Sequence, residues 1–413
     1  MNLAILLYEN RKAKLLNILK IGLIPFFRFV STGEIEEELG LVQSRENLLN
    51  ILMNTFDKDE NIILPIIGGV GTGKTHLYWS LKKKLHFYNT FYISLENVYR
   101  KFYYNMYSEY IEEMGGGEVL RSITNKLCAE WGATERKFGF FHIADIDKVR
   151  KSAFEKLKSN FDNKIALNDV INAITSHQLD PYKRVEAERW LLGELMDIRD
   201  LSHLNILYDL KRKSYAYTML KIIIENSELR SVIFIDDFEK IVSLMKGDKK
   251  SEEIFDPSWL YGEEHIQSPE TRSAQKALDK ILDLQKIRGL RIIITLKSID
   301  ALEEIKSIIR EKNNQLLATM KEPIILSNFL ENDIFQFYTE NMKSFLKNNN
   351  YLEFFEEYPD SYFPLNEKIL KYIHACSQGN PREIIKFFIK IFNEIIFSNN
   401  NFDNILSYYE NQC

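Results

Sequence analysis

The sequence predicts an α/β protein with a parallel sheet, a long helical insertion and a helical C-terminal region. Three observations indicate this. An apolar run, residues 62–67, leads into a glycine-rich stretch that is followed by a helical pattern. A second apolar run, 232–235, ends in two carboxylates, and a third, 291–294, ends in a threonine. Short apolar runs separated by helical patterns are typical of buried parallel strands.

The first 60 residues carry apolar side chains at helical spacing, interrupted near Pro25 and Gly33. We expect them to form helices that brace the core. Residues 41–46 precede a predicted helix that runs to Thr55, and Ser44 is a candidate N-cap for it. The strand at 62–67 contains one discordant residue, Pro65.

The glycine-rich stretch reads Gly-Gly-Val-Gly-Thr-Gly-Lys-Thr and matches the phosphate-binding loop pattern at every fixed position. Its glycines allow positive φ values, so that successive amides can surround a triphosphate. Lys74 is predicted to bind the β- and γ-phosphates, and the Thr75 hydroxyl to bind Mg²⁺. A chance glycine-rich turn would lack the strand before it and the helix after it. The predicted nucleotide contacts are Gly68, Gly69, Val70, Gly71, Thr72, Gly73, Lys74, Thr75 and His76.

A second strand is predicted at residues 90–95, and residues 97–227 carry helical periods with no convincing strand. This region is an insertion beyond what a minimal phosphate-loop core needs. Aromatic residues at its start recur at helical spacing, which favours core packing over a base-stacking platform. These are Phe102, Tyr103, Tyr104, Tyr107 and Tyr110.

The apolar run 232–235 reads as a buried strand, and Asp236 and Asp237 would emerge at its carboxyl end, where ligands of α/β sheets bind. Asp236 is predicted to hold the Mg²⁺ shell, and Asp237 to polarise an attacking water. Thr295, at the end of the third strand, could reach the γ-phosphate or that water, and Lys297 and Ser298 are rivals for this role. Alternatively, Asp236 and Asp237 are only the acidic end of a strand and take no part in chemistry.

Two further segments complete this region. Residues 246–271 are polar, carry Trp259 and Tyr261, and are predicted to form a long loop. Residues 273–286 are predicted to form a helix, and residues 322–326 the last strand.

From residue 331 onward the pattern is helical, and one turn stands out. Asn380 suits an N-cap, Pro381 the first helical position, and Glu383 a capping box. Arg382 lies in the first turn, where a cation opposes the helix dipole by about 0.3–1 kcal/mol. Either an anion such as a γ-phosphate lies nearby, or Arg382 is an ordinary surface residue.

Composition narrows the class of protein. The chain has 413 residues, 45% of them hydrophobic, and a net charge of −5, which gives no global attraction to nucleic acid. The basic clusters at 11–14, 82–84 and 211–213 resemble ordinary solvated faces. Three scattered cysteines predict neither a disulfide framework nor a zinc site. No apolar run suits a signal peptide or a bilayer span, so we expect no membrane and a cytoplasmic protein.

Taken together, these motifs resemble the AAA+ class of P-loop NTPases, especially its initiator-like and STAND branches. The resemblance implies a three-layer core, ATP and Mg²⁺ as cofactors, Pro381 against the base and Arg382 as a sensor of the γ-phosphate. Residues 41–46 would then be either a turn beside the adenine or a plain helix start. A looser resemblance, carried by residues 189–194, is to ATP-binding proteins of phage-exclusion (BREX) systems.

The chain also departs from that class. Most AAA+ enzymes have a glutamate where this chain has Asp237, so hydrolysis is expected to be slow, or Glu239 substitutes for it. Residues 316–321, just before Pro323, contain no arginine that could serve as an arginine finger, and Arg310 is the nearest candidate. We therefore do not expect ring assembly. Residues after 396 leave no room for a DNA-binding winged helix.

The predicted domains are a helical segment at 1–60, a core at 61–96 and 228–330, a helical insertion at 97–227 and an α-helical lid at 331–413. The predicted function is that of an ATP-dependent conformational switch acting on a protein or DNA partner, with oligomerisation possible. A non-hydrolysing nucleotide-binding scaffold is the alternative. A phosphotransferase is less favoured, because 162 positions separate Lys74 from Asp236 and such enzymes are usually compact.

Overall fold

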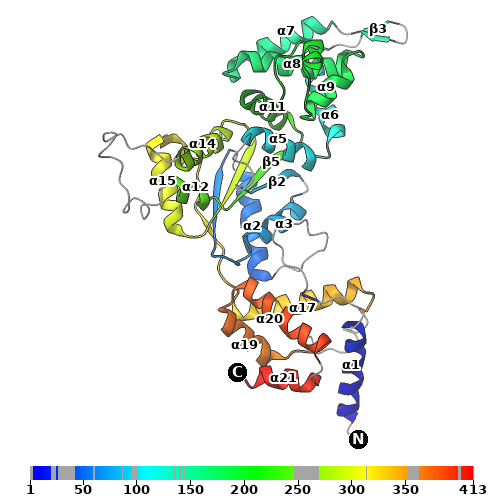
Figure 1. Cartoon of the computed structure of the whole chain (residues 1–413), viewed down its shortest axis with the longest axis vertical. Coiled ribbons are helices and arrows are strands. Elements are labelled where there is room, and N and C mark those ends of the chain that lie inside the picture. Colours follow the sequence, from blue (N-terminus) through cyan, green and yellow to red (C-terminus); the bar gives the residue numbers. More distant parts are fainter. Residues whose placement is uncertain are drawn as a thin grey trace. The chain divides into compact units, whose positions relative to one another are not determined.

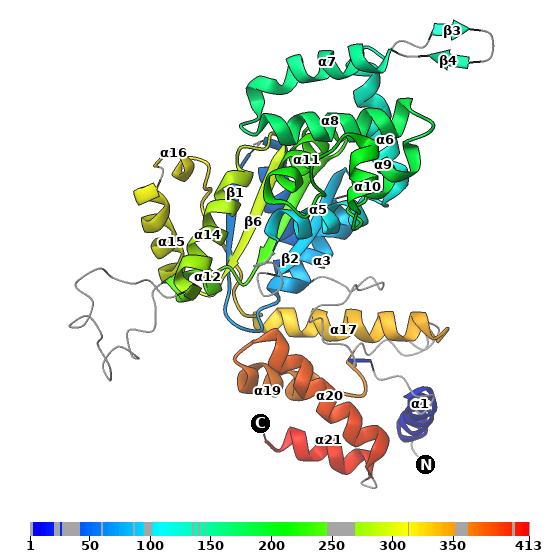
Figure 2. The ribbon, with the colours of Figure 1, turned by 45° about the horizontal axis from the view of Figure 1, so that its top comes forward.

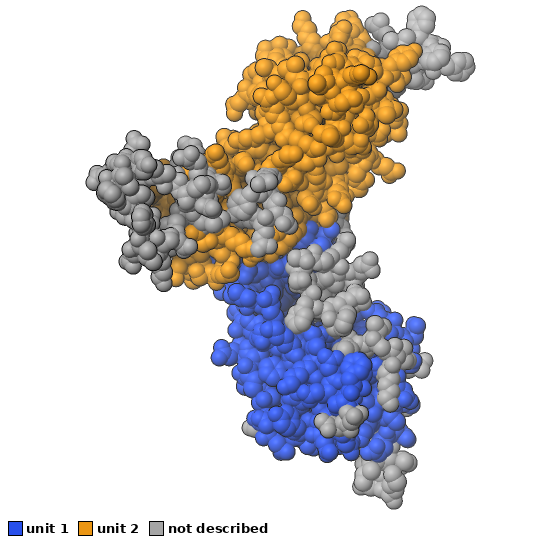
Figure 3. All heavy atoms as spheres, viewed as in Figure 1, with its two compact units in different colours: residues 1–55, 66–83, 324–413 blue, residues 56–65, 84–323 orange. Residues whose placement is uncertain are grey.

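A computed structural model describes most of the chain. The described residues are 3–19, 25–26, 42–58, 61–85, 87–94, 101–133, 136–138, 141–143, 145–245, 269–312, 314–351, 362–398 and 401–412. The chain divides into two compact units, which Figure 3 colours separately. Unit 1 comprises residues 1–55, 66–83 and 324–413, and unit 2 comprises residues 56–65 and 84–323. The predicted domain bounds remain a prediction.

Five strands form the main sheet, in the order β2-β5-β6-β1-β7. They are β1 (Ile63–Ile67), β2 (Tyr88–Ser94), β5 (Arg230–Asp236), β6 (Leu290–Leu296) and β7 (Ile324–Ile325). The pairings of β2 with β5, β5 with β6 and β1 with β7 are parallel. Every residue of β6 is buried, as expected for a strand covered on both faces. The predicted α/β class and all five predicted strands are confirmed.

Within unit 2, the insertion is largely helical, as predicted (Figure 1). Its helices are α5 (Phe102–Glu113), α6 (Gly117–Glu130), α7 (Ile146–Leu157), η1 (Lys158–Asn160), α8 (Lys164–Leu179), α9 (Arg184–Leu191), α10 (Ile198–Leu204) and α11 (Lys213–Asn226). Four of the five aromatic residues of α5 named above are fully buried, and Tyr104 is half-buried, so the core interpretation is confirmed. The expectation of no strand is wrong, because Arg136–Phe138 (β3) and Phe141–Ile143 (β4) form a short antiparallel hairpin.

The remaining helices of unit 2 follow β5 and β6. They are α12 (Glu239–Met245), α14 (Pro269–Leu284), α15 (Ile299–Lys312) and α16 (Asn314–Leu317). Helix α14 begins at Pro269, so the predicted loop at 246–271 ends earlier than expected, since proline suits a first helical turn. The rest of that loop, with Trp259 and Tyr261, lies outside the described residues. Figure 2 shows α5 and α11 alongside β2 and β5 within this unit.

Unit 1 is mostly helical. Its helices are α1 (Leu3–Leu19), most of α2 (Gln43–Lys58), nearly all of α3 (Lys74–Lys84), α17 (Glu331–Asn348), α19 (Glu367–Ser377), α20 (Pro381–Phe397) and α21 (Phe402–Glu410). The helical pattern predicted from residue 331 onward is confirmed, and apolar residues of α17 and α20 at helical spacing are buried in one hydrophobic core with residues of α1, α19 and α21. One correction concerns the N-terminal segment: α2 starts at Gln43, so Ser44 is not its N-cap. Helix α1 lies where helical spacing was predicted. Among the described helices, none is long and apolar enough to cross a bilayer.

Candidate functional site

The phosphate loop follows β1 directly, and its last residues open α3. Gly71 and Gly73 have φ values of 82° and 97°, which only glycine adopts readily. Gly68 and Gly69 do not need positive φ, contrary to the expectation for all four glycines. At Gly68 the constraint is space instead: a Cβ would lie 2.6 Å from the Thr72 hydroxyl and 3.1 Å from Leu326. The loop is therefore shaped by glycine for two different reasons.

Lys74 is the first residue of α3, and its ammonium lies against the loop itself. Its Nζ atom donates to the carbonyl oxygens of Gly68 at 2.7 Å and Gly69 at 3.2 Å. These carbonyls hold a positive charge within the loop, where a phosphate group would meet it. Thr75 and His76 complete the first turn of α3. Burial, followed by the charges of Arg45 and Lys83, lowers the pKa of His76 to about 4, so its imidazole is neutral at pH 7.

Arg45, which the sequence analysis did not single out, supports the loop from α2. The side chain is only 6% exposed. Its guanidinium donates to the carbonyl of Thr72 at 3.2 Å and of Ser327 at 2.6 Å, and it lies 5.2 Å from the ring centroid of Phe329. Burial lowers the pKa of Arg45, and Asp333 opposes that shift. In the sequence, Arg45 is only an arginine near the start of a predicted helix, and that position does not indicate contact with the phosphate loop.

The first turn of α20 is bonded to the phosphate loop. Asn380 caps the helix as predicted, accepting from the amides of Arg382 at 3.1 Å and Glu383 at 3.4 Å. Its side-chain amide donates to the carbonyl of Val70 at 2.8 Å, and the Arg382 amide donates to that of Gly71 at 3.2 Å. A Cβ on Gly71 would lie 2.6 Å from Asn380 Oδ1 and 2.8 Å from Arg382 Cβ. Loop and helix thus meet backbone to backbone.

The other predicted residues of α20 take distinct positions. Pro381 is buried at the first helical position, as its missing N–H allows. The Arg382 side chain is exposed and forms no ion pair with any described residue. Glu383 pairs with Lys386 at 2.6 Å. The turn before the helix is fixed by Gly379, whose carbonyl accepts from the Phe329 amide at 2.7 Å.

In unit 2, the carboxyl end of β5 carries a buried carboxylate with three donors. Asp236 is 5% exposed. Its Oδ1 accepts from the Thr295 hydroxyl and from the Asp237 amide at 2.9 Å, and its Oδ2 accepts from the Tyr92 hydroxyl at 2.8 Å. Thr295 thus contacts Asp236, and Lys297 and Ser298 lie just beyond it. The roles predicted for these residues remain predictions.

Tyr92 is the residue of this cluster that sequence reasoning missed. The register of β2 and β5 pairs Tyr92 with Phe234, and their rings stack at 6.0 Å. Asp236 follows Phe234 by two positions and therefore shares its face of the sheet. The signal was present in the two-residue period of the strands, but it needed the register, which the sequence does not supply.

Asp237 and Glu239 lie just beyond the strand. Asp237 has φ of 54°, an uncommon left-handed conformation for a residue other than glycine, and its carboxylate lies 3.4 Å from Lys240 Nζ. Glu239, in the first turn of α12, lies 3.0 Å from Lys297 Nζ. Ser298 accepts from the Ala301 amide at the start of α15, and Arg310 is exposed on that helix. Both acids proposed for water activation therefore have a lysine neighbour.

No protein-family model and no curated protein sequence matches this chain. Among solved structures, "Structure of the Aeropyrum Pernix ORC2 protein (ADPNP-ADP complexes)" aligns with 96% of this chain and 71% of that one, at 11% identity and a TM-score of 0.39. The function proposed below therefore rests on the residues of this chain.

Proposed function

We propose that the protein is an ATP-binding, slowly hydrolysing P-loop ATPase of AAA+ type that acts as a nucleotide-dependent switch on a protein or DNA partner. The observation that carries the proposal is the direct bonding of the first turn of α20 to the carbonyls of Val70 and Gly71. Whatever occupies the phosphate loop must also affect the helix that is bonded to it. We place the protein in the cytoplasm.

The phosphate loop supplies the nucleotide contacts. Its amides and the α3 N-terminus attract an anion, and Lys74 would exchange its bonds to two carbonyls for bonds to phosphate oxygens. Arg382 is exposed on the helix turn that contacts Gly71, and it would meet the terminal phosphate. Pro381, beside it, would lie against the base. Loss of the terminal phosphate would then remove a partner of α20, and that coupling is the switch.

The residues proposed to hold Mg²⁺ are Thr75 and Asp236, whose hydroxyl and carboxylate oxygens are the donors that this ion prefers. Magnesium would neutralise charge on the phosphates. Three donors orient the Asp236 carboxylate in advance, and Thr295 is one of them. Asp237 would polarise water, with Glu239 as its substitute.

A non-hydrolysing scaffold is the second candidate, and one observation favours it. The Asp237 carboxylate is one methylene shorter than a glutamate and lies beside Lys240 at 3.4 Å. The lysine competes with a water molecule for the oxygens of this carboxylate. Measurements of phosphate release with and without candidate partners separate a slow ATPase from a scaffold.

Nucleotide binding is tested with Lys74→Ala and the matched control Lys343→Ala, whose lysine is exposed on α17. Calorimetric titration with ATP and Mg²⁺ should show binding to the wild type and the control, and loss of at least about tenfold in affinity for Lys74→Ala, since a charge-assisted phosphate contact is removed. Equal thermal melting of both variants would establish that they fold. Unchanged affinity in Lys74→Ala would overturn the proposal.

A further inference from the structure

Three consecutive aromatic residues of α5, in unit 2, each carry a lysine from another segment over the ring. The Nζ atoms of Lys280, Lys213 and Lys211 lie 5.6, 5.9 and 5.9 Å from the ring centroids of Phe102, Tyr103 and Tyr104 respectively. These distances are within the range of cation–π attraction. Lys280 belongs to α14, whereas Lys211 and Lys213 lie at the start of α11. Consecutive residues of a helix point in different directions, so these are three separate contacts around α5, and Lys213 and Lys276 are the cations close enough to Lys280 to lower its pKa.

Two more cations extend this group. Arg212 lies 3.6 Å from the ring centroid of Tyr208. Lys276 is exposed one helical turn before Lys280 on α14. We call the five together the basic surface: Lys211, Arg212, Lys213, Lys276 and Lys280. Lys213 begins α11, Lys211 and Arg212 precede it, and Lys276 and Lys280 lie on α14. Figures 1 and 2 show α11 and α14, together with α5, which carries the rings.

The five cations of the basic surface are not held in ion pairs by the residues that the structure describes. Within the described part of the chain, none of its five cations forms an ion pair with a carboxylate. Burial lowers the pKa of Lys280, and Lys213 and Lys276 lower it further, as expected where like charges crowd together. Carboxylates lie nearby without pairing with these cations: Asp283 pairs with Lys286 at 2.8 Å, and Asp162 lines a pocket together with Arg212 and Lys213. Asp279, on α14 like Lys280, acts with Asp283 on Tyr103. This concentration of positive charge is unusual in a chain whose net charge is −5.

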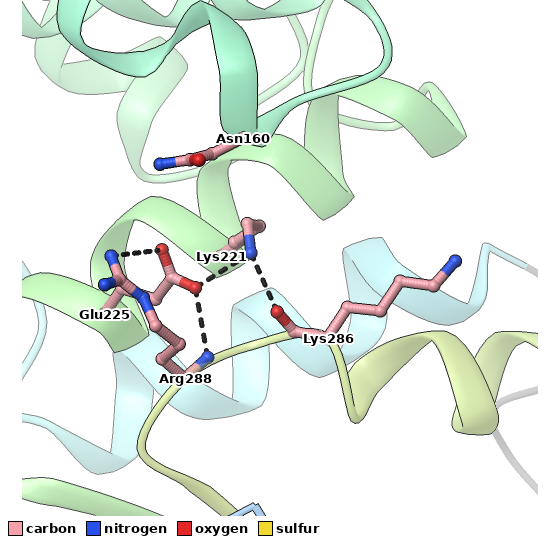
Figure 4. A pocket seen from close by; sticks show the side chains of 5 residues that line it. All are labelled: Asn160, Lys221, Glu225, Lys286 and Arg288. Atoms are coloured by element: carbon pink, nitrogen blue, oxygen red, sulfur yellow. Dashed lines mark hydrogen bonds and ion pairs between the residues drawn. The ribbon is translucent and has the colours of Figure 1, made fainter. Parts of the chain in front are cut away.

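A neighbouring cluster shows the opposite arrangement. Figure 4 shows Lys221, Glu225 and Arg288 around a cavity of about 350 Å³. Glu225 lies 2.8 Å from Lys221 Nζ and 3.7 Å from Arg288, and Lys221 also donates to the carbonyl of Lys286. These cations are held by the protein itself. Of the two clusters, the basic surface is the one that leaves its charge for an external anion.

We propose that the basic surface binds the phosphate backbone of duplex DNA. Lysine and arginine are the side chains that contact phosphates, and several of them on adjoining helices match a polyanion better than a single small ligand. A single strand would need bare rings on which to stack bases. Phe102 and Tyr103 are each only 2% exposed and lie beneath their lysines, so these two rings cannot stack on bases, and the more exposed ring of Tyr208 is covered by Arg212.

If the proposed function holds, DNA is the partner on which the switch acts. Only that link rests on the proposed function; the binding of DNA itself does not. Binding to DNA is separable from binding to ATP, because the two are measured with different variants. Failure of ATP binding would leave the basic surface untouched, and failure of DNA binding would leave the phosphate loop untouched.

The test uses the full chain and a fluorescent DNA duplex of arbitrary sequence, with anisotropy measured over a series of salt concentrations. The variant is Arg212→Gln, Lys213→Gln and Lys276→Gln together, which spares Lys280 because that side chain is partly buried. The control neutralises three exposed lysines of unit 1: Lys343→Gln, Lys347→Gln and Lys390→Gln. Both variants carry the same net charge.

The expected result is weaker binding by the first variant, by about tenfold or more, with the control near wild type. The slope of log K against log salt should fall by about 0.9 for each phosphate that the variant no longer neutralises. Equal affinity and equal slope in the two variants would overturn the inference. So would single-stranded DNA that binds as tightly as the duplex, or wild-type protein that does not bind duplex at low salt. Circular dichroism confirms that both variants are folded.

Discussion

The phosphate loop and the carboxyl end of β5 carry the two halves of the proposed chemistry, and they are built in opposite ways. The loop is eight consecutive residues, shaped by its own glycines and bonded to the Arg382 amide and the Asn380 side chain at the start of α20. The end of β5 joins Tyr92, Asp236 and Thr295, which come from three neighbouring strands and whose side chains hydrogen-bond to one another. A contiguous motif tolerates little change in its backbone, whereas a composite cluster depends on strand register.

The largest effect is expected at Gly71, where loop and helix are closest. Gly71→Ala would force a side chain into positive φ and place its Cβ 2.6 Å from Asn380 Oδ1. We expect a loss of about 1–3 kcal/mol in unfolding free energy from strain alone, and at least tenfold weaker ATP binding. Titration with ATP and chemical denaturation measure the two.

Gly132→Ala is the matched control, because Gly132 has φ of 100° and a Cβ added there would meet no atom within 4 Å. That variant should show the backbone cost without the loss of ATP affinity. If Gly71→Ala and Gly132→Ala bind ATP equally well, the contact between the loop and α20 has no role in nucleotide binding.

A smaller effect is expected from Asn380→Ala. Removal of an N-cap costs about 1 kcal/mol in stability, and here it also removes the bond to the Val70 carbonyl. We expect ATP affinity to fall severalfold. Asn401→Ala removes the N-cap of α21 and should lower stability alone. ATP titrations of the two variants, run in parallel, measure this difference. Identical ATP affinities in Asn380→Ala and Asn401→Ala would contradict a role for the Asn380 bond to Val70 in nucleotide binding.

The smallest effect is expected from Tyr92→Phe, which deletes one hydrogen bond to Asp236 and keeps the ring on Phe234. Such a bond contributes about 0.5–1.5 kcal/mol. If Asp236 holds Mg²⁺, a fluorescent ATP analogue should need severalfold more Mg²⁺ for tight binding. Tyr88→Phe is the control, because Tyr88 lies on the same strand and donates to Asp57 at 2.9 Å. An unchanged Mg²⁺ dependence in Tyr92→Phe would exclude this role for Tyr92.

The same contrast explains what the sequence could predict. The strands, the phosphate loop and the cap at Asn380 follow from local patterns, and the structure places them as expected. The supporting bonds of Arg45 and Tyr92 depend on which distant segments lie side by side, and no local pattern encodes that. The β3–β4 hairpin was missed because its strands are only three residues long, too short for a two-residue period to register.

The side chain of Asn380 uses both of its polar atoms, the oxygen on its own helix and the nitrogen on the loop. An aspartate there would still start the helix well but could offer no proton to Val70. Asn380→Asp would therefore keep the helix cap while removing the bond to the loop, which would separate the stability of α20 from the coupling that we propose.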